Sequence, residues 1–412
     1  MKPFKYAQLL ALVATHVWLA ACLGQSVDQT EDQNAQPAAA GLQSAPWPES
    51  VTKIVNDSPN KKQLQKLLAE EDGEIRAAVE FLINNMPKQD LEALGAEFLL
   101  EDIQWAIKIR KQSKWKMSDQ IFFNYVLPYA NVDETREPWR EKLNKICLPL
   151  IADCKTSAEA AQELNSKFFK KIGVKYSTKR KKANQSPSES MEQGLASCTG
   201  LSILLVDACR SVGVPARLTG IPSWTNKRGN HTWVEIWDGG TEDQKGEWHF
   251  TGAAEPSKKG LNNAWFQKDA ALAKKDSRRN AIYAISFAKT DTTFPMVWTR
   301  GWRNSIHAIN VTDRYTKSKK QEEELNVDLI NAYVRVWNKD KTERVVTFVS
   351  IEDKDGWRKG GRSRGNQADM NDMLQFQIKK NSEYRIKLGD GQWQTLTTTD
   401  KKQQTFEFQL EK

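Results

Sequence analysis

Residues 197–217 read SCTGLSILLVDACRSVGVPAR, and this stretch sets the fold of the middle of the chain. Ser197 is a favourable N-cap residue, because its hydroxyl can accept a hydrogen bond from an N–H group of the first helical turn. Gly213 and Pro215 are residues that commonly end helices. Between them, apolar side chains recur on one face at helical spacing, at Leu201, Leu204, Leu205, Ala208 and Val212. The stretch therefore predicts a helix that carries Cys198 in its first turn.

The first turn of a helix is a favourable place for a reactive thiol. Its N–H groups have no partner within the helix, and the positive end of the helix dipole stabilises a thiolate. Cys198 is therefore the candidate nucleophile. Cys209 lies about three turns farther on, ~16 Å along the axis, so no disulfide can join the two cysteines. We expect Cys209 to be a buried packing residue.

A thiol nucleophile also needs a base, and the chain has four histidines. His16 lies in an apolar N-terminal segment. His231 opens the alternating stretch HTWVEIW and follows a turn-like segment at 226–230. A histidine at the start of a strand, beside a loop, is placed to reach a cleft, so His231 is the candidate base. His249 and His307 are expected to be structural.

Taken in order, these segments resemble the transglutaminase-like superfamily, which includes transglutaminases, bacterial thiol proteases and peptide N-glycanases. The resemblance covers residues 186 to about 270. It consists of the Cys198 helix followed by GVPAR, His231 in HTWVE, and Gly-x-Trp at 246–248 ahead of Glu255 and a proline. It implies a papain-related thiol fold for this part of the chain.

The resemblance also implies a mechanism. Cys198 would attack an amide carbonyl after His231 accepts its proton, which gives an acyl-enzyme that water or an amine resolves. The backbone N–H of Cys198 would help to hold the oxyanion. Gln193 could donate a second hydrogen bond, as a glutamine does in papain-like enzymes, although a surface role is the alternative.

One position departs from the family pattern. Members usually have an aspartate about four residues after the tryptophan equivalent to Trp248, and here that position is Gly252. Glu255 is the nearest carboxylate, and it could orient His231 from a shifted position. Alternatively, Glu255 caps a turn, and the site is a degenerate one that binds without cutting.

Three functions from different classes remain open at this point. The first is a thiol peptidase or amidase that acts on a peptide or protein substrate. The second is a catalytically silent binding or scaffold protein, and the third is an amine-transferring transglutaminase. We expect no cofactor and no metal, because the cysteines form no CxxC pair and no acidic cluster indicates calcium.

The N-terminus reads as an export signal. Lys2 and Lys5 precede an apolar run at 6–21, which is shorter than the ~20 residues that span a bilayer. The run ends in LAAC, which resembles the bacterial lipobox, in which the cysteine, here Cys22, is lipidated. Leu23 follows in place of an aspartate retention signal. We therefore expect a lipoprotein anchored through Cys22, at the outer membrane and facing the periplasm.

The remaining composition sets further limits. The net charge of +9 is spread along the chain without a basic stripe or a reading motif, so no nucleic-acid partner is expected. Export permits disulfides, but Cys147 and Cys154 could pair only if the residues between them are not helical. We expect them to remain free.

Apolar patterning divides the rest of the chain. Helical periodicity follows a Gln-, Ser- and Pro-rich segment, and the C-terminal part alternates like strands at 332–337, 345–350, 374–378, 384–388 and 406–410, with a hairpin signal at Asp390-Gly391. The predicted parts are a signal peptide and lipobox at 1–22, a flexible linker at 23–60, a helical region at 61–180, a transglutaminase-like domain at 181–290 and a β-rich, Ig-like sandwich domain at 291–412. The predicted fold class is α+β.

Overall fold

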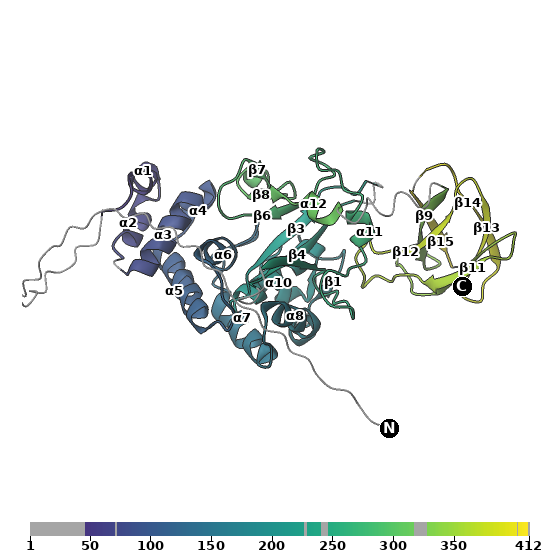
Figure 1. The fold of residues 1–412 in the computed structure, drawn as a ribbon, viewed down its shortest axis with the longest axis horizontal. Helices are drawn as coiled ribbons and strands as arrows, with labels where there is room; N and C mark the ends of the chain where they lie inside the picture. The colour runs from purple at the N-terminus through teal and green to yellow at the C-terminus, as the bar shows by residue number, and fades with distance from the viewer. Residues whose placement is uncertain are drawn as a thin grey trace, which may run out of the picture. The chain divides into compact units, whose positions relative to one another are not determined.

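The computed structural model describes residues 46–70, 72–225, 229–239, 246–316, 328–401 and 403–410. All of them belong to one compact unit. The lipobox with Cys22, and residues 226–228 of the turn before His231, lie outside the described residues. The fold is α+β, with helices first, a mixed core next and strands last (Figure 1).

The N-terminal part of the described chain is helical, as predicted. Its helices pack around one apolar cluster that includes Leu82, Leu99 and Phe122. They are α1 Glu49–Asp57, α2 Lys61–Leu67, α3 Gly73–Asn85, α4 Lys88–Ala93, α5 Ala96–Gln112 and α6 Asp119–Tyr125, followed by α7 Arg140–Cys147, the 3-10 turn η1 Leu148–Ile151 and α8 Ser157–Ile172.

The linker predicted at 23–60 is wrong at its C-terminal end, because α1 lies inside it. Val51 and Val55 are four residues apart and therefore share one helix face, and both are buried. Helix α1 packs against α3 through this short apolar face. The pattern was too brief to stand out in a segment otherwise rich in polar residues.

The core of the molecule is a six-stranded sheet covered on one face by α10 (Cys198–Arg210). The sheet order is β5-β4-β3-β6-β8-β7, and each neighbouring pair is antiparallel. Its strands are β3 Ala216–Ile221, β4 His231–Asp238, β5 Glu247–Thr251, β6 Tyr283–Ile285, β7 Thr292–Thr293 and β8 His307–Asn310. Shorter elements around it are β1 Lys175–Tyr176, which pairs with β2 Leu195–Ala196, together with α9 Pro187–Gln193, α11 Gln267–Ala270, η2 Arg300–Trp302 and α12 Thr312–Thr316.

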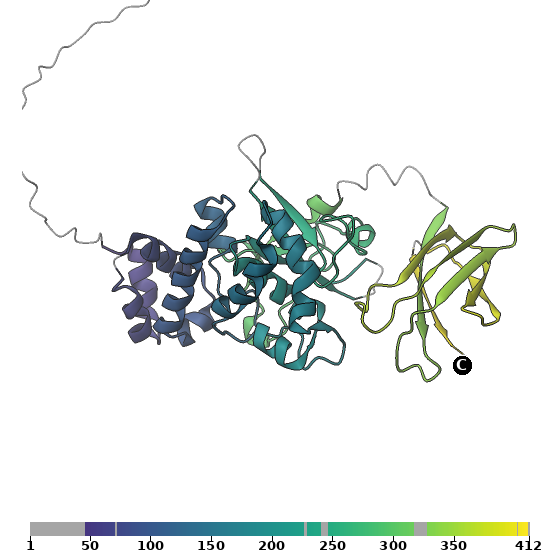
Figure 2. The same cartoon turned by 90° about the horizontal axis from the view of Figure 1, so that it is seen from below.

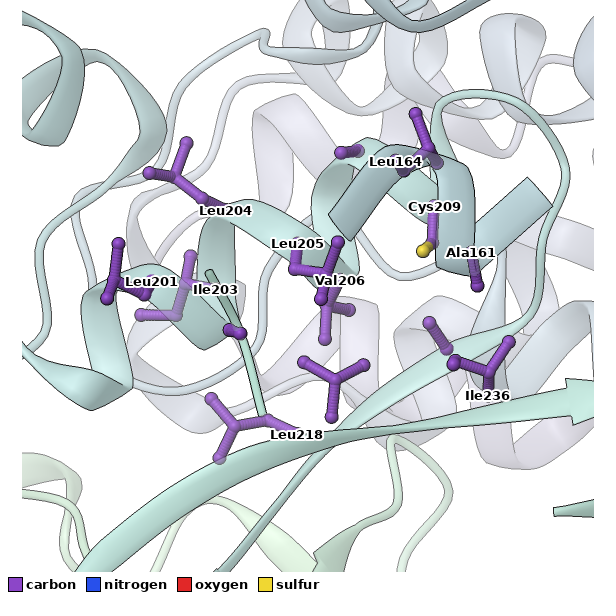
Figure 3. Close-up of a cluster of buried hydrophobic side chains, with 14 of the residues drawn as sticks. Ala161, Leu164, Leu201, Ile203, Leu204, Leu205, Val206, Cys209, Leu218 and Ile236 are labelled. Carbon is purple, nitrogen blue, oxygen red and sulfur yellow. The ribbon is translucent and has the colours of Figure 1, made fainter. Parts of the chain in front are cut away.

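Helix α10 is the centre of this core. Figure 3 shows it lying across the strands that carry Leu218 and Ile236, with Cys209 on the side that faces Ala161 and Leu164 of α8. Every residue of α10 from Thr199 onward is buried, and each fully buried large aliphatic side chain contributes roughly 1.5–3 kcal/mol. This packing holds the first turn of α10 in a fixed place.

The C-terminal part is a sandwich of two sheets, as predicted. One sheet has the order β11-β10-β13-β14 and the other β12-β9-β15, and Figure 2 shows this strand-rich part of the chain. Side chains of the two sheets form a separate core around Val334, Ile351 and Ile386. Asp390-Gly391 lies in the connection between the antiparallel strands β13 and β14. The strands are β9 Leu329–Trp337, β10 Phe348–Asp353, β11 Arg358–Arg362, β12 Leu374–Lys379, β13 Glu383–Leu388, β14 Trp393–Thr397 and β15 Gln403–Gln409.

The boundary predicted at residue 291 falls inside the core sheet. Strand β8 pairs with β6, and β7 pairs with β8, so the chain stays in the core until α12. The sandwich begins only at β9. The alternating pattern of a short strand does not show which other strand it pairs with. The sequence therefore could not assign β7 and β8 to the core sheet rather than to the sandwich.

Candidate functional site

Cys198 is the first residue of α10, as its sequence predicted. The Ser197 hydroxyl accepts a hydrogen bond from the Gly200 N–H at 3.0 Å and donates one to the Ala183 carbonyl at 2.5 Å. The N–H of Cys198 lies in the first turn, where the intrahelical ladder leaves donors free. Cys198 is half-buried, whereas the other three cysteines of the described chain are buried, and all four are free.

His231 is the first residue of β4 and lies opposite Ile221 in the sheet. Its ring is packed among aromatic side chains, with centroid distances of 4.8 Å to Trp265, 5.0 Å to Phe266 and 6.2 Å to Trp224. Only 2% of the side chain is exposed. These contacts hold the imidazole in one orientation.

The structure brings Cys198 and His231 together with a third residue, Asp369. The sulfur of Cys198, a ring nitrogen of His231 and a carboxylate oxygen of Asp369 all lie within 4.8 Å of one another. The His231 Nδ1 to Asp369 Oδ2 distance is 3.5 Å, an ion-pair distance that is longer than a typical hydrogen bond. The thiol, the imidazole and the carboxylate therefore form one compact cluster.

Electrostatic interactions among Cys198, His231 and Asp369 shift the pKa values of His231 and Asp369. Burial lowers the pKa of His231, but the Asp369 carboxylate and the Cys198 thiol beside it outweigh burial and raise that pKa well above its ordinary value. Burial raises the pKa of Asp369, yet His231 and hydrogen bonds from Asn371 bring it below its ordinary value. The site therefore favours a protonated imidazole beside the Asp369 carboxylate and the Cys198 thiol.

Glu255, the carboxylate proposed from the sequence to orient His231, lies beside this group. Its Oε2 accepts a hydrogen bond from the Trp265 indole at 2.7 Å. Burial raises the pKa of Glu255 to about 7, an effect that the positive charge of His231 reduces. Within the described chain, neither ring nitrogen of His231 has a hydrogen bond to Glu255.

Asp369 is the residue that the sequence did not reveal. It lies in the loop between β11 and β12 of the sandwich, far along the chain from Cys198 and His231. The loop reads NQADMND at 366–372, which is an ordinary polar loop composition. No spacing rule links it to a helix start or a strand start in another part of the chain.

The other residues weighed from the sequence have local roles. The Gln193 side-chain oxygen accepts hydrogen bonds from the Lys181 N–H at 3.0 Å and from Gln185 at 3.1 Å, so the side chain ties down a neighbouring loop. His249 bonds to Asn262 at 2.9 Å, and His307 to the Thr290 carbonyl at 2.9 Å.

The same three atoms of Cys198, His231 and Asp369 are also the one cluster in the described chain with metal-ligand spacing. Sulfur, imidazole and carboxylate are all zinc ligands, so a soft divalent cation could compete with a proton for this site. The sequence had no metal motif, because the third donor comes from a distant loop.

One comparison with known families matches the core. A family model described as the transglutaminase-like superfamily matches residues 144–251. That segment contains Cys198 and His231 and ends before Glu255 and Asp369. The chain has no significant match among curated proteins.

Two solved structures are similar to parts of the chain. A Cytophaga hutchinsonii protein described as a candidate cysteine protease is 17% identical with a TM-score of 0.27, over 48% of this chain and 68% of its own. Red sea bream transglutaminase is 10% identical with a TM-score of 0.33, over 70% of this chain and 65% of its own. The family-model match alone identifies a transglutaminase-like domain at residues 144–251.

Proposed function

We propose that this protein is a thiol peptidase or amidase that cleaves amide bonds through an acyl-thioenzyme formed on Cys198. The observation that carries the proposal is the placement of a half-buried thiol at the start of a buried helix, with an imidazole nitrogen within 4.8 Å of its sulfur. A thiolate beside an imidazolium is the reactive form of a catalytic cysteine.

The reaction would follow from this geometry. The Cys198 thiol passes its proton to His231, and its sulfur attacks the amide carbonyl carbon. The oxyanion that forms is stabilised by the free N–H of Cys198. The C–N bond then breaks, and the leaving amine takes the proton from the imidazolium. A water molecule, deprotonated by His231, hydrolyses the thioester and restores the thiol.

Burial limits what can reach the sulfur. His231 is almost fully covered and Cys198 is only half-buried, so a substrate has to approach the sulfur from the exposed side of Cys198. We infer an extended peptide or a side-chain amide as the substrate class. Amine transfer differs only in the second step, where an amine replaces water.

The proposal is tested by trapping the acyl-enzyme. The full chain is incubated with p-nitrophenyl acetate, and the intact mass is measured with and without hydroxylamine. We expect one acetyl group that hydroxylamine removes, which is absent from Cys198→Ser and strongly reduced in His231→Ala. No acylation of the folded parent, or equal acylation of Cys198→Ser, would favour the scaffold function.

Hydrolysis and transfer are then separated by the fate of the acyl group. With a peptide substrate and an added primary amine, a hydrolase releases free acid at a rate that the amine barely changes. A transglutaminase instead forms the amide with the added amine. We expect release of free acid.

We further propose that the protein is exported and anchored to the outer membrane, facing the periplasm, by lipid on Cys22. The support is the lipobox-like LAAC that ends the apolar N-terminal run. In the described part of the chain, no helix has both the length and the apolar character needed to cross a bilayer.

A further inference from the structure

We propose that the C-terminal sandwich completes the active site, with Asp369 as the positioning residue that holds His231 for its reaction with Cys198. The inference rests on the proposed function and adds to it a role for a domain outside the family match. Asp369 and His231 are both almost fully buried, and their facing atoms are 3.5 Å apart. A carboxylate at Nδ1 fixes the tautomer of the ring and stabilises the imidazolium.

The loop that carries Asp369 is shaped by its own domain. The guanidinium of Arg344, which is 3% exposed, donates to the carbonyls of Ala368, of Asp369 at 3.1 Å and of Asp372 at 3.2 Å. Asp369 Oδ1 accepts a hydrogen bond from the Asn371 N–H at 2.8 Å. One carboxylate oxygen is thereby held in the loop, and Oδ2 is the oxygen that faces His231.

The same loop is fastened to the core on both sides of the site. The Met370 N–H donates to the Tyr176 hydroxyl at 3.1 Å, next to β2 and the start of α10. The Asn371 side chain donates to the Asn230 carbonyl at 2.7 Å, one residue before His231. Outside the loop, Tyr333 of β9 donates to the Asp269 carboxylate of α11. The docked position of the sandwich therefore determines where the Asp369 carboxylate lies.

Asp369 is better placed for this role than Glu255. Glu255 Oε2 accepts a hydrogen bond from the Trp265 indole, and burial raises the pKa of Glu255 to about 7. The pKa of Asp369 is held below its ordinary value, so Asp369 is a carboxylate throughout the neutral range. The ionisable groups that face His231 are then Cys198, Asp369 and Glu255, and only Asp369 stands at ion-pair distance from its Nδ1.

The experiment measures the pH profile of Cys198 alkylation by iodoacetamide in the full chain. Asp369→Asn keeps the shape of the side chain and removes its charge. Without that charge the imidazolium loses its proton at lower pH, so the thiolate is left without a cationic partner. We expect the acid limb of the profile to move to higher pH and the rate near pH 6 to fall on the order of tenfold. Asp369→Glu, which keeps the carboxylate, should recover part of the rate.

The matched control is Asp372→Asn, from the same loop. The Asp372 carboxylate pairs with Arg364 at 3.0 Å rather than with His231, so its profile should stay close to that of the parent. If Asp369→Asn does not fold, Asn371→Ala loosens the docking and keeps the Asp369 charge. It should shift the profile in the same direction by less.

The outcomes separate the two proposals. If His231→Ala abolishes fast alkylation while Asp369→Asn and Asn371→Ala react like the parent, the role of Asp369 is overturned and the thiol–imidazole pair stands. The role is also overturned if Glu255→Gln alone moves the profile. If His231→Ala itself reacts like the parent, the proposed function fails, whatever Asp369 does.

Discussion

The carboxylate of Glu255 occupies the space that a side chain at Gly252 would need. A Cβ built on Gly252 would lie 2.6 Å from Glu255 Oε2 and 3.2 Å from Glu255 Cβ. The two residues face each other across an isolated antiparallel bridge directly after β5. Position 252 is where the resemblance leads us to expect an aspartate. A carboxylate therefore still lies near this place, although it comes from three residues later.

This relationship predicts a pair of substitutions that compensate for each other. Gly252→Asp should destabilise the protein by roughly 1–3 kcal/mol, because it forces a side chain into filled space beside a like charge. Glu255→Ala empties that space. In the double variant the new aspartate should fit, so the coupling between the two changes should be favourable by about 0.5–3 kcal/mol. Urea unfolding of the parent, both single variants and the double variant measures it, and strictly additive effects would contradict the overlap.

Glu255 should also make stability depend on pH. Burial raises its pKa from 4.5 in the unfolded chain to about 7 in the folded protein. Its contribution to stability is therefore fully present below pH 4.5 and is lost as the pH rises through 7. Glu255→Gln keeps an acceptor for Trp265 and removes the titration. Between pH 4.5 and 8 the variant should gain on the order of 3 kcal/mol relative to the parent, at about 1.4 kcal/mol per pKa unit. The measurement is urea unfolding of parent and variant at both pH values. The same difference in unfolding free energy between them at pH 4.5 and at pH 8 would refute this prediction.

The four described cysteines should differ sharply in reactivity. Burial raises the pKa of Cys147 to about 12 and that of Cys209 even higher, so both stay as covered thiols at neutral pH. Cys198 is half-buried at a helix start. A short iodoacetamide pulse at pH 7 followed by peptide mapping should label Cys198 at least ten times faster than Cys209. Labelling of both at the same slow rate in the folded protein would argue against the nucleophile.

The sequence was sufficient for the two elements that carry the thiol and the imidazole. The signals that predict α10 are local: Ser197, the apolar face of the helix and Gly213 each affect the structure of residues only a few positions away. His231 begins β4, where alternation of the following residues predicted a strand. Local signals determine local structure, and the resemblance supplied the expectation that these two elements meet.

The third carboxylate could not be found in this way. Asp369 reaches His231 only because the sandwich docks on the core, and docking depends on scattered contacts such as Asn371 with Asn230. None of these contacts has a period or a spacing in the sequence. The predicted boundary of the sandwich was wrong for the same reason, because the pairing of β8 with β6 joins residues that are far apart in the sequence.

The proposed lipid anchor makes a separate prediction. Cys22→Ser removes the residue that would be acylated and leaves the apolar run before it intact. Export should then yield an uncleaved precursor or a released protein in place of a membrane-bound one. Membrane fractionation and the mass of the mature N-terminus distinguish these outcomes. An unchanged mass and membrane fraction in the variant would rule out lipidation at this residue.

The last prediction concerns Arg344, which binds backbone carbonyls of the loop that carries Asp369 and so shapes that loop. Its planar guanidinium donates to three carbonyls at once, whereas a lysine ammonium on a flexible stem cannot reproduce that fork. Arg344→Lys keeps the charge and leaves buried carbonyls without a donor, at a cost of about 1–3 kcal/mol.

Because the loop then holds Asp369 less firmly, the alkylation profile of Cys198 should move toward that of Asp369→Asn. Arg358→Lys is the matched control, since the Arg358 side chain is 76% exposed and its pair with Glu352 lies away from the loop. It should change the unfolding free energy by less than about 1 kcal/mol and leave the profile in place. Arg344→Lys could instead lose stability and keep the alkylation profile of the parent. The hydrogen bonds of Arg344 would then stabilise the sandwich only, and the pKa of His231 would not depend on how tightly the loop is held.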